Sequence, residues 1–292
     1  MGRRLATEHR AARAAFAEAD DVLHVHLARL CFEGPEAELV RTENAQPAIL
    51  AVSVATWRAL ASEMEIRPAW LAGHSLGEYT ALVVAGALTF ADALSLVRTR
   101  GRLMQSAVPE GSGAMAAVIG LSDDAVAALC AAEAEGEIVA PANFNGAGQT
   151  VVAGHRAAVR RVMEAARGAG ARVLELAVSA PFHCSLMAPA AESLARALAG
   201  VPIAPLAVSV VTNVEAALNS DPARVRSLLV AQVTAPVRWA ESMRLLRRLG
   251  CTRALEVGPG QVLTRLLQRM ELGIEAVAAG EGEGWPALVD WA

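Results

Sequence analysis

Residues 73–77 read Gly-His-Ser-Leu-Gly, with the short apolar run Ala69-Trp70-Leu71-Ala72 before them and a helical pattern over 78–85 after them. A serine between two glycines at a strand-to-helix turn is the pattern of a nucleophile elbow. At so sharp a turn, side chains two positions either side of the serine would meet neighbouring backbone, which favours glycine. The five residues also occur by chance in loops, but their context favours an elbow. We therefore expect Ser75 Oγ to project from a sheet and the Leu76 amide to point at any oxyanion formed there.

Composition and charge narrow the class of protein. The chain has 292 residues, of which 54% are hydrophobic and only 4% aromatic. This composition predicts an α/β fold with a core of Ala, Val and Leu, in one large domain or a domain with an insertion. The net charge of −4 argues against nucleic acid as the main ligand. The four cysteines have no zinc-ligand or Cys-x-x-Cys spacing, so we expect reduced thiols and no metal site.

Nothing in the sequence indicates export or membrane insertion. Arg3 and Arg4 are followed by a charged amphipathic helical pattern rather than an apolar signal segment. The longest uncharged run, 197–214, contains two prolines and a glycine, and a buried strand within 207–212 explains it better than a membrane span. We expect a cytoplasmic monomer with no membrane association.

The chain divides into two parts by its pattern. Residues up to about 110 are helical apart from the strand before Ser75. The segment 111–180 then predicts a strand, helix, two strands, helix and strand, namely strands at 114–119, 138–142, 150–153 and 172–178 and helices from 122 and over 156–167. This βαββαβ order is the ferredoxin-like arrangement. We expect this small subdomain to be inserted in a large one formed by 1–110 and 181–292, with a ligand cleft between them.

The large part resumes its α/β alternation after Pro181. We expect helices over 189–198, 222–232 and 237–249, a strand over 253–257 and a helix from 262.

A serine hydroxyl needs a base, and histidine is the usual one. Of the six histidines, His9, His24, His26 and His155 fit solvated or capping positions, and His74 fits a packing position on the opposite side of the turn. His183 lies where the chain returns from the insert. It is also compatible with a core histidine, and the acids between Ser75 and His183 are poor third members of a triad. We favour a Ser75–His183 dyad whose imidazole is oriented by a backbone carbonyl.

Arg100 lies on the helical pattern that follows Ser75. A guanidinium binds a carboxylate through two parallel hydrogen bonds. Taken alone, Arg98, Arg100 and Arg102 are equally compatible with a solvated helix face.

Taken together, the motifs resemble those of one family. They are Gly-His-Ser-Leu-Gly-Glu-Tyr at 73–79, Arg-Gly-Arg-Leu-Met-Gln at 100–105, Pro-Glu-Gly-Ser-Gly-Ala-Met at 109–115, Asn-Phe-Asn at 143–145, Ala-Pro-Phe-His-Cys-Ser-Leu-Met at 180–187, Pro-Val-Arg-Trp at 236–239 and Glu-Val-Gly-Pro-Gly at 256–260. In this order, and over nearly the whole chain, they resemble malonyl-CoA:acyl carrier protein transacylases, including discrete enzymes of fatty acid synthesis and acyltransferases of polyketide synthases. The resemblance implies an α/β-hydrolase-like large subdomain with a ferredoxin-like insert.

The resemblance also implies roles. Ser75 would carry the malonyl ester, His183 would act as base and then acid, and the carbonyl of Gln232 would orient His183. Arg100 would pair with the malonyl carboxylate, and Leu76 would supply half of the oxyanion hole. Positions lining the substrate cleft would be Met104, Asn143, Gln149 and Phe182.

The implied substrate is malonyl-CoA, the acceptor is the phosphopantetheine thiol of an acyl carrier protein, and no bound cofactor is expected. A plain acetyl group would leave Arg100 without its partner, so a dicarboxylic acyl group is favoured. The bulk of Phe182 and Leu76 resembles the malonyl rather than the methylmalonyl pattern. The alternatives are a hydrolase that clears acyl groups from carrier proteins, against which Arg100 argues, and a non-catalytic carrier-binding remnant.

The N-terminal end departs from the family pattern. Members begin with a strand and a Gly-Gln-Gly-Ser-Gln loop, whose first glutamine donates the second oxyanion-hole amide. This sequence starts at Met1-Gly2-Arg3, just after that loop ends in the family. Either the start is set too late, or the protein lacks the first strand and half of its oxyanion hole. We expect the former, because every other motif is intact.

Overall fold

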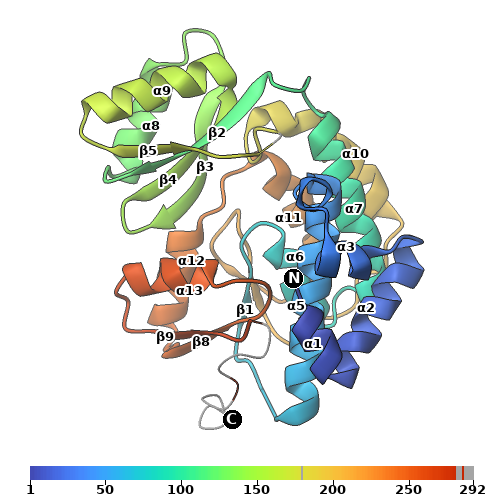
Figure 1. Ribbon diagram of the computed structural model, residues 1–292. Coiled ribbons are helices and arrows are strands. Elements are labelled where there is room, and N and C mark those ends of the chain that lie inside the picture. The colour runs from blue at the N-terminus through green and yellow to red at the C-terminus, as the bar shows by residue number, and fades with distance from the viewer. Residues whose placement is uncertain (179, 281–284, 286–292) are drawn as a thin grey trace.

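A computed structural model describes residues 1–178, 180–280 and 285, so part of the expected large subdomain, 281–284 and 286–292, lies outside the described residues. The chain is a mixed α/β protein (Figure 1). Its helices are α1 (Arg3–Glu8), α2 (Arg10–Leu23), α3 (Leu27–Glu33), α4 (Glu36–Leu39), α5 (Thr42–Glu63), α6 (Gly77–Val84), α7 (Phe90–Ser106), α8 (Asp123–Ala132), α9 (Arg156–Gly168), α10 (Ala188–Ala199), α11 (Pro222–Thr234), α12 (Trp239–Arg248) and α13 (Val262–Arg269). Its strands are β1 (Leu71–Ala72), β2 (Gly113–Ile119), β3 (Val139–Gly146), β4 (Gln149–His155), β5 (Arg172–Glu175), β6 (Val210–Val211), β7 (Leu218–Asn219), β8 (Arg253–Glu256) and β9 (Glu275–Ala278).

The predicted helical first part is present as a layer of packed helices. The long helix α5 is buried along most of its length and contacts α2, α6 and α7. Helix α7 approaches it closely at Gly101, where an added Cβ would lie 2.6 Å from the carbonyl oxygen of Thr42 and 2.7 Å from Glu43 Cα. Because only glycine allows this approach, Arg100 on α7 comes to lie beside Gln46 on α5.

The strand predicted before Ser75 is present but short. β1 pairs in parallel with β6, Leu71 opposite Val210 and Ala72 opposite Val211, and β6 pairs antiparallel with β7. The predicted strand over 207–212 is likewise reduced to the two residues of β6. Strands β8 and β9 form a separate parallel pair, and a cavity of about 460 Å³ lies between β8 and β1, with Trp70 and Leu255 among its lining residues.

The predicted βαββαβ elements are all present between residues 113 and 175, although the last strand, expected over 172–178, ends at Glu175. Their strands form an antiparallel sheet in the order β3-β4-β2-β5, with α8 and α9 packed on one face (Figure 1). Ser122 caps α8 by accepting a hydrogen bond from the Ala125 amide, as its sequence pattern predicts. The other face packs against Phe182, Cys184 and Leu186. Within the described chain, no helix is long and apolar enough to cross a membrane.

Candidate active site

The turn at Ser75 has the geometry of a nucleophile elbow. Ser75 itself has a positive φ of 50°, which is strained for a non-glycine residue. At Gly73 an added Cβ would lie 2.0 Å from the backbone of Gly77, so glycine is required there. The expectation for Gly77 is wrong, because a Cβ on that residue would meet nothing within 4 Å. Only the first glycine of the motif is fixed by a clash.

Ser75 and His183 are in direct contact. Ser75 Oγ lies 2.7 Å from His183 Nε2, and His183 Nδ1 lies 2.9 Å from the carbonyl oxygen of Gln232. A carbonyl only accepts hydrogen bonds, so Nδ1 carries the proton and Nε2 presents its lone pair to the hydroxyl. Burial, together with the positive charge of Arg100, lowers the pKa of His183 to about 3. The imidazole is therefore neutral at physiological pH and free to accept a proton.

Arg100 is buried rather than solvated, with only 2% of its surface exposed. Its Nη1 donates to Gln46 Oε1 at 2.6 Å, and its Nη2 donates to Gln232 Oε1 at 3.0 Å and to Ser75 Oγ at 3.1 Å. Its Nε has no hydrogen-bond partner among the described residues. The three arginines that were equivalent by sequence are thus distinguished by the fold, which turns only Arg100 toward the serine.

Asn213 holds the elbow from both sides, a role that the sequence did not indicate. Its Oδ1 accepts from the Ser75 amide at 2.6 Å, and its Nδ2 donates to the Gly73 carbonyl at 2.6 Å. The Asn213 amide in turn donates to Glu78 Oε2 at 3.1 Å. A single carboxamide therefore fixes the backbone on both sides of His74.

Glu78 lies beneath the elbow, with 2% of its surface exposed. Its carboxylate accepts from Gln232 Nε2 at 2.7 Å, and the same nitrogen donates to the Ser75 carbonyl at 3.0 Å. Burial raises the pKa of Glu78 to about 7, against the opposing effect of these hydrogen bonds and of Arg100. Gln232 therefore contributes its side chain as well as its backbone carbonyl.

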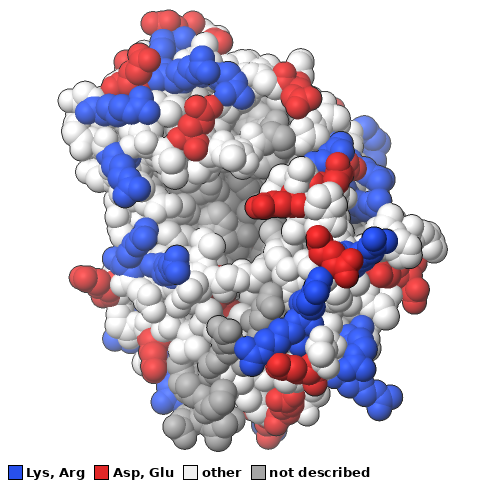
Figure 2. All heavy atoms as spheres, in the orientation of Figure 1, with Lys and Arg blue, Asp and Glu red and all other residues white. Residues whose placement is uncertain are grey.

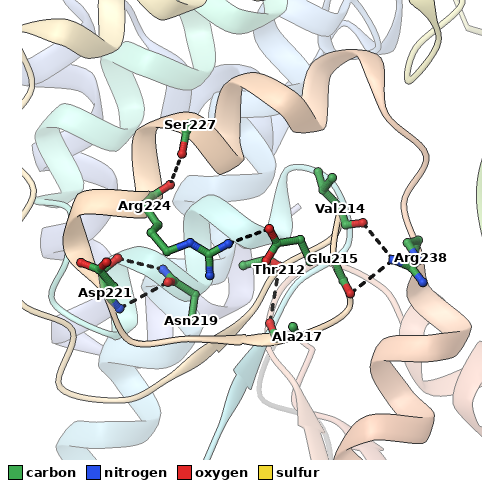
Figure 3. Close-up of polar contacts among 9 residues, drawn as sticks. All are labelled: Thr212, Val214, Glu215, Ala217, Asn219, Asp221, Arg224, Ser227 and Arg238. Carbon is green, nitrogen blue, oxygen red and sulfur yellow. Dashed lines mark hydrogen bonds and ion pairs between the residues drawn. The ribbon is translucent and has the colours of Figure 1, made fainter.

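The loop that carries Asn213 is itself held by polar contacts (Figure 3). Arg238 donates to the carbonyl oxygens of Val214 and Glu215, at 3.4 and 3.3 Å, and Arg224 bonds to the Glu215 carboxylate at 2.6 Å. The Asn219 side chain bonds to the backbone of Asp221, the N-cap residue of α11. This loop and the helix that carries Gln232 are thus fixed to one another.

The remaining predicted site residues differ in how close they lie to Ser75 and its partners. Leu76 is buried, and its amide makes none of the hydrogen bonds found among the described residues, which leaves it available to a ligand. Met104 is buried with its sulfur 3.9 Å from Gln46 Nε2. Phe182 packs between the helical core and the four-stranded sheet.

Asn143 and Gln149 are not brought into the cluster by any hydrogen bond of the described residues. Asn143 lies on β3, where it forms a backbone bridge to Val237, and Gln149 begins β4. The side chain that meets the elbow from β3 is instead Asn145, whose Oδ1 lies 2.9 Å from His74 Nε2. His74 also packs against Trp239, as expected of a packing residue.

The surface is hollowed between the part that carries the four-stranded sheet and the helices (Figure 2). Acidic and basic side chains are interspersed on the face shown. The chemistry available at Ser75 is nucleophilic acyl transfer, because an activated hydroxyl, a neutral base and a free amide converge there. The buried guanidinium of Arg100 beside the hydroxyl can also bind a negatively charged group of a ligand.

Comparisons with known proteins agree with this chemistry. The family model for the acyl transferase domain matches residues 1–276. A malonyl CoA-acyl carrier protein transacylase of Salmonella typhimurium is 48% identical over 267 residues, which cover 91% of this chain and 86% of that protein. A crystal structure of an acyl carrier protein S-malonyltransferase from Vibrio cholerae matches with a TM-score of 0.95 and 44% identity, over 99% of this chain and 94% of that one. A structure of a type II polyketide synthase acyl carrier protein in complex with its malonyl-transacylase gives a TM-score of 0.96 and 44% identity, with the same coverage. The chain therefore belongs to the acyl transferase domain family.

Proposed function

We propose that this chain transfers a malonyl group from malonyl-CoA to the phosphopantetheine thiol of an acyl carrier protein, through an ester on Ser75. The observation that carries the proposal is that Ser75 Oγ lies within hydrogen-bond distance of both a neutral imidazole and a buried guanidinium. The relatives named above, malonyl transferases and a complex with a carrier protein, support the same donor and acceptor. The carrier would belong to fatty acid or polyketide synthesis.

In the first half-reaction His183 Nε2 accepts the Ser75 proton while Oγ attacks the thioester carbonyl of malonyl-CoA. The tetrahedral intermediate collapses by breaking the carbon–sulfur bond, and the proton on His183 passes to the departing thiolate. The Gln232 carbonyl stabilises the imidazolium that forms between these steps. The Leu76 amide donates to the oxyanion, a contact of the kind whose removal typically costs about a hundred- to a thousandfold in rate.

In the second half-reaction the phosphopantetheine thiol replaces CoA. His183 takes the thiol proton, the thiolate attacks the malonyl ester, and the carbon–oxygen bond to Ser75 breaks. The proton then returns to Ser75 Oγ, which restores the starting state. No cofactor enters either half-reaction, since both are exchanges between an ester and a thioester.

Arg100 would select the acyl group by pairing with its free carboxylate. An acetyl group would leave the buried guanidinium with no anionic partner. Met104, Asn143, Gln149 and Phe182 would line the acyl and pantetheine path, and the bulk of Phe182 and Leu76 would disfavour an α-methyl branch. Malonyl is therefore the proposed substrate, ahead of methylmalonyl and acetyl.

We further propose that residues 111–180 form a ferredoxin-like subdomain inserted in an α/β-hydrolase-like subdomain of 1–110 and 181–292. The βαββαβ order and the strand order β3-β4-β2-β5 support the first part of this division. The protein would act as a cytoplasmic monomer.

The experiment that tests the function supplies malonyl-CoA with a carrier protein in its phosphopantetheine form. Transfer to the thiol and release of free malonate are measured together, by mass spectrometry of the carrier and by chromatography. We expect transfer to dominate, with the carrier lacking phosphopantetheine as the control. Release of malonate at a rate equal to or above thiol transfer would identify a hydrolase instead.

A further inference from the structure

Arg100 is a buried cation whose hydrogen-bond partners are all neutral. Two carboxamide oxygens and one hydroxyl accept from it, namely Gln46 Oε1, Gln232 Oε1 and Ser75 Oγ. A buried guanidinium is normally paired with a carboxylate, because an uncompensated charge in a protein interior costs several kcal/mol. Here three hydrogen bonds to neutral acceptors hold Nη1 and Nη2, while the charge is not cancelled.

The other charged and titratable groups around Arg100 do not neutralise it at close range. Glu78 influences its pKa, but the Glu78 carboxylate bonds to Gln232 and to the Asn213 amide rather than to the guanidinium. The Tyr79 ring lies 5.6 Å from the guanidinium carbon, and His183 faces Ser75. Burial lowers the pKa of Arg100, and Tyr79 and Glu78 oppose this shift without forming a hydrogen bond to the guanidinium.

The two carboxamides are held so that their oxygens face the arginine. Gln46 Nε2 donates to Thr42 Oγ1 at 3.0 Å, and Gln232 Nε2 donates to the Ser75 carbonyl and to Glu78. Since each nitrogen has an acceptor of its own, rotating either amide would place N–H groups against the guanidinium and leave those acceptors unpaired. The close approach at Gly101 brings the backbone of α7 against that of α5, the helix from which Gln46 reaches Arg100.

We propose that the side-chain carboxamides of Gln46 and Gln232 are positioning residues that set the preference for a carboxylate-bearing acyl group. They aim Arg100 at Ser75 with neutral acceptors and so keep its charge free for the substrate. A carboxylate at either position would supply the anion from within the protein and remove the reason to bind one from outside. The inference rests on the proposed malonyl transfer. It adds that the two neutral carboxamides are the reason why Arg100 prefers an acyl group with a carboxylate.

The test replaces Gln46 by glutamate, which has the same shape and adds one negative charge next to Nη1. The Thr42 hydroxyl can rotate from acceptor to donor, so the local hydrogen bonds survive the change. Loading of Ser75 is measured with malonyl-CoA and with acetyl-CoA in parallel. We expect Gln46→Glu to lower kcat/KM for malonyl-CoA about a hundredfold, mainly through KM, while acetyl-CoA changes by less than about threefold.

Two further variants separate charge from shape. Gln46→Met removes the acceptor without adding charge, and we expect a loss of about tenfold for malonyl-CoA with malonyl still preferred. Gln268→Glu adds the same charge on the exposed face of α13 and should leave kcat/KM unchanged for both substrates. Melting temperatures of all three variants report whether the fold is intact. If Gln46→Glu does not fold, Gln46→Met carries the test through the lost acceptor, and a folded Gln46→Met that loads malonyl-CoA as fast as the unaltered protein overturns the inference.

The outcomes distinguish this inference from the function itself. A malonyl-to-acetyl ratio that is unchanged in a folded Gln46→Glu protein overturns the inference while leaving malonyl transfer intact. If the malonyl-to-acetyl ratio falls as far in Gln46→Met as in Gln46→Glu, the added charge is not the cause, and the inference is overturned as well. Failure of the unaltered protein to load malonyl contradicts the proposed function instead.

Discussion

The four-stranded sheet and the surroundings of Ser75 are fixed by different means. In the sheet, β2 pairs with β4 along all seven of its residues, so an uninterrupted backbone ladder holds the two strands together. Around Ser75 the strands are minimal, because β1 and β6 share only two residue pairs. There the carboxamides of Asn213 and Gln232 take over, bonding to the elbow backbone across 138 to 157 residues of sequence.

Because of this difference, we expect the two regions to contribute differently to stability and to activity. A backbone ladder repeats its hydrogen bonds along the strand, so the loss of one side chain leaves the ladder in place. The elbow is held by single amides, so the loss of one shifts the nucleophile directly, and misplacement by about 1 Å can cost a hundredfold in rate. Variants in the sheet should therefore change melting more than loading, and variants around the elbow should do the reverse.

The largest effect is expected from the base. His183→Gln should slow loading of Ser75 by about ten-thousandfold, because the hydroxyl loses its proton acceptor. His74→Gln is the matched control, since glutamine can still bond to Asn145, and it should lose less than about tenfold. Loading rates come from rapid quench and mass spectrometry. Equal losses in the two variants would contradict the assignment of His183.

A strong effect is next expected from the amide that clamps the elbow. Asn213→Leu leaves the Ser75 amide and the Gly73 carbonyl unpaired, and we expect loading to fall about a hundredfold. The control is Asn219→Leu, which removes a buried asparagine from β7, the strand that follows the same loop, but breaks only its side-chain contacts with Asp221 (Figure 3).

Both asparagine variants should lose stability, by about 1–3 kcal/mol for each buried group left unpaired. Only Asn213→Leu should lose loading beyond what its folded fraction explains. If Asn219→Leu slows loading as much, the clamp is not specific to the elbow, and the contrast between the two regions fails.

The pH dependence should be weak on the acid side. His183 must be neutral to accept the Ser75 proton, and its pKa is lowered from 6.5 to about 3. It therefore stays neutral as the pH falls from 8 to 5, and loading should change by less than about twofold over that range. A change in the loading rate centred near pH 7 would arise from Glu78, whose pKa is about 7, and should be absent in Glu78→Gln. An acid limb centred near 6.5 that persists in Glu78→Gln would contradict the lowered pKa.

The smallest effect on loading is expected in the sheet. Thr150 is fully buried on β4 and donates to the Asp123 carboxylate. Thr150→Val keeps the shape and should cost about 1 kcal/mol, or a fall of about 2–4 °C in melting temperature, with loading unchanged. Calorimetry and the loading assay on the same sample measure both. A loading defect larger than the loss of folded protein would show that the sheet controls the site.

The sequence predicted the regular elements and the chemistry carried by local motifs. Ser122 and the short apolar run of 114–119 predict α8 and β2, because a helix cap and a buried apolar run are signals of a few adjacent residues. Ser75 was recognised from its glycines and its strand-to-helix setting, and His183 from its position after the insert. The strands beside Ser75 are shorter than predicted, since only two residues of 69–72 and two of 207–212 pair in the sheet.

The roles of Gln46, Asn213 and Glu78 could not be predicted in this way. Each acts on a group that is near in space, yet Gln46 lies 54 residues from Arg100 and Asn213 lies 138 residues from Ser75. Their own neighbours in sequence carry no sign of these partners. The burial of Arg100 belongs to the same class, since it follows from the approach of two helices at Gly101 and not from the helix pattern around it.

The central claim is that Ser75 carries the malonyl group, and mass spectrometry tests it most directly. The protein is mixed with malonyl-CoA and quenched in acid. Its intact mass is measured, and a digest then locates the adduct, with Ser75→Ala treated in the same way as the matched variant. We predict one malonyl group on the peptide that contains Ser75 and none on Ser75→Ala. No adduct on the unaltered protein, or an adduct that persists in Ser75→Ala, would contradict the account.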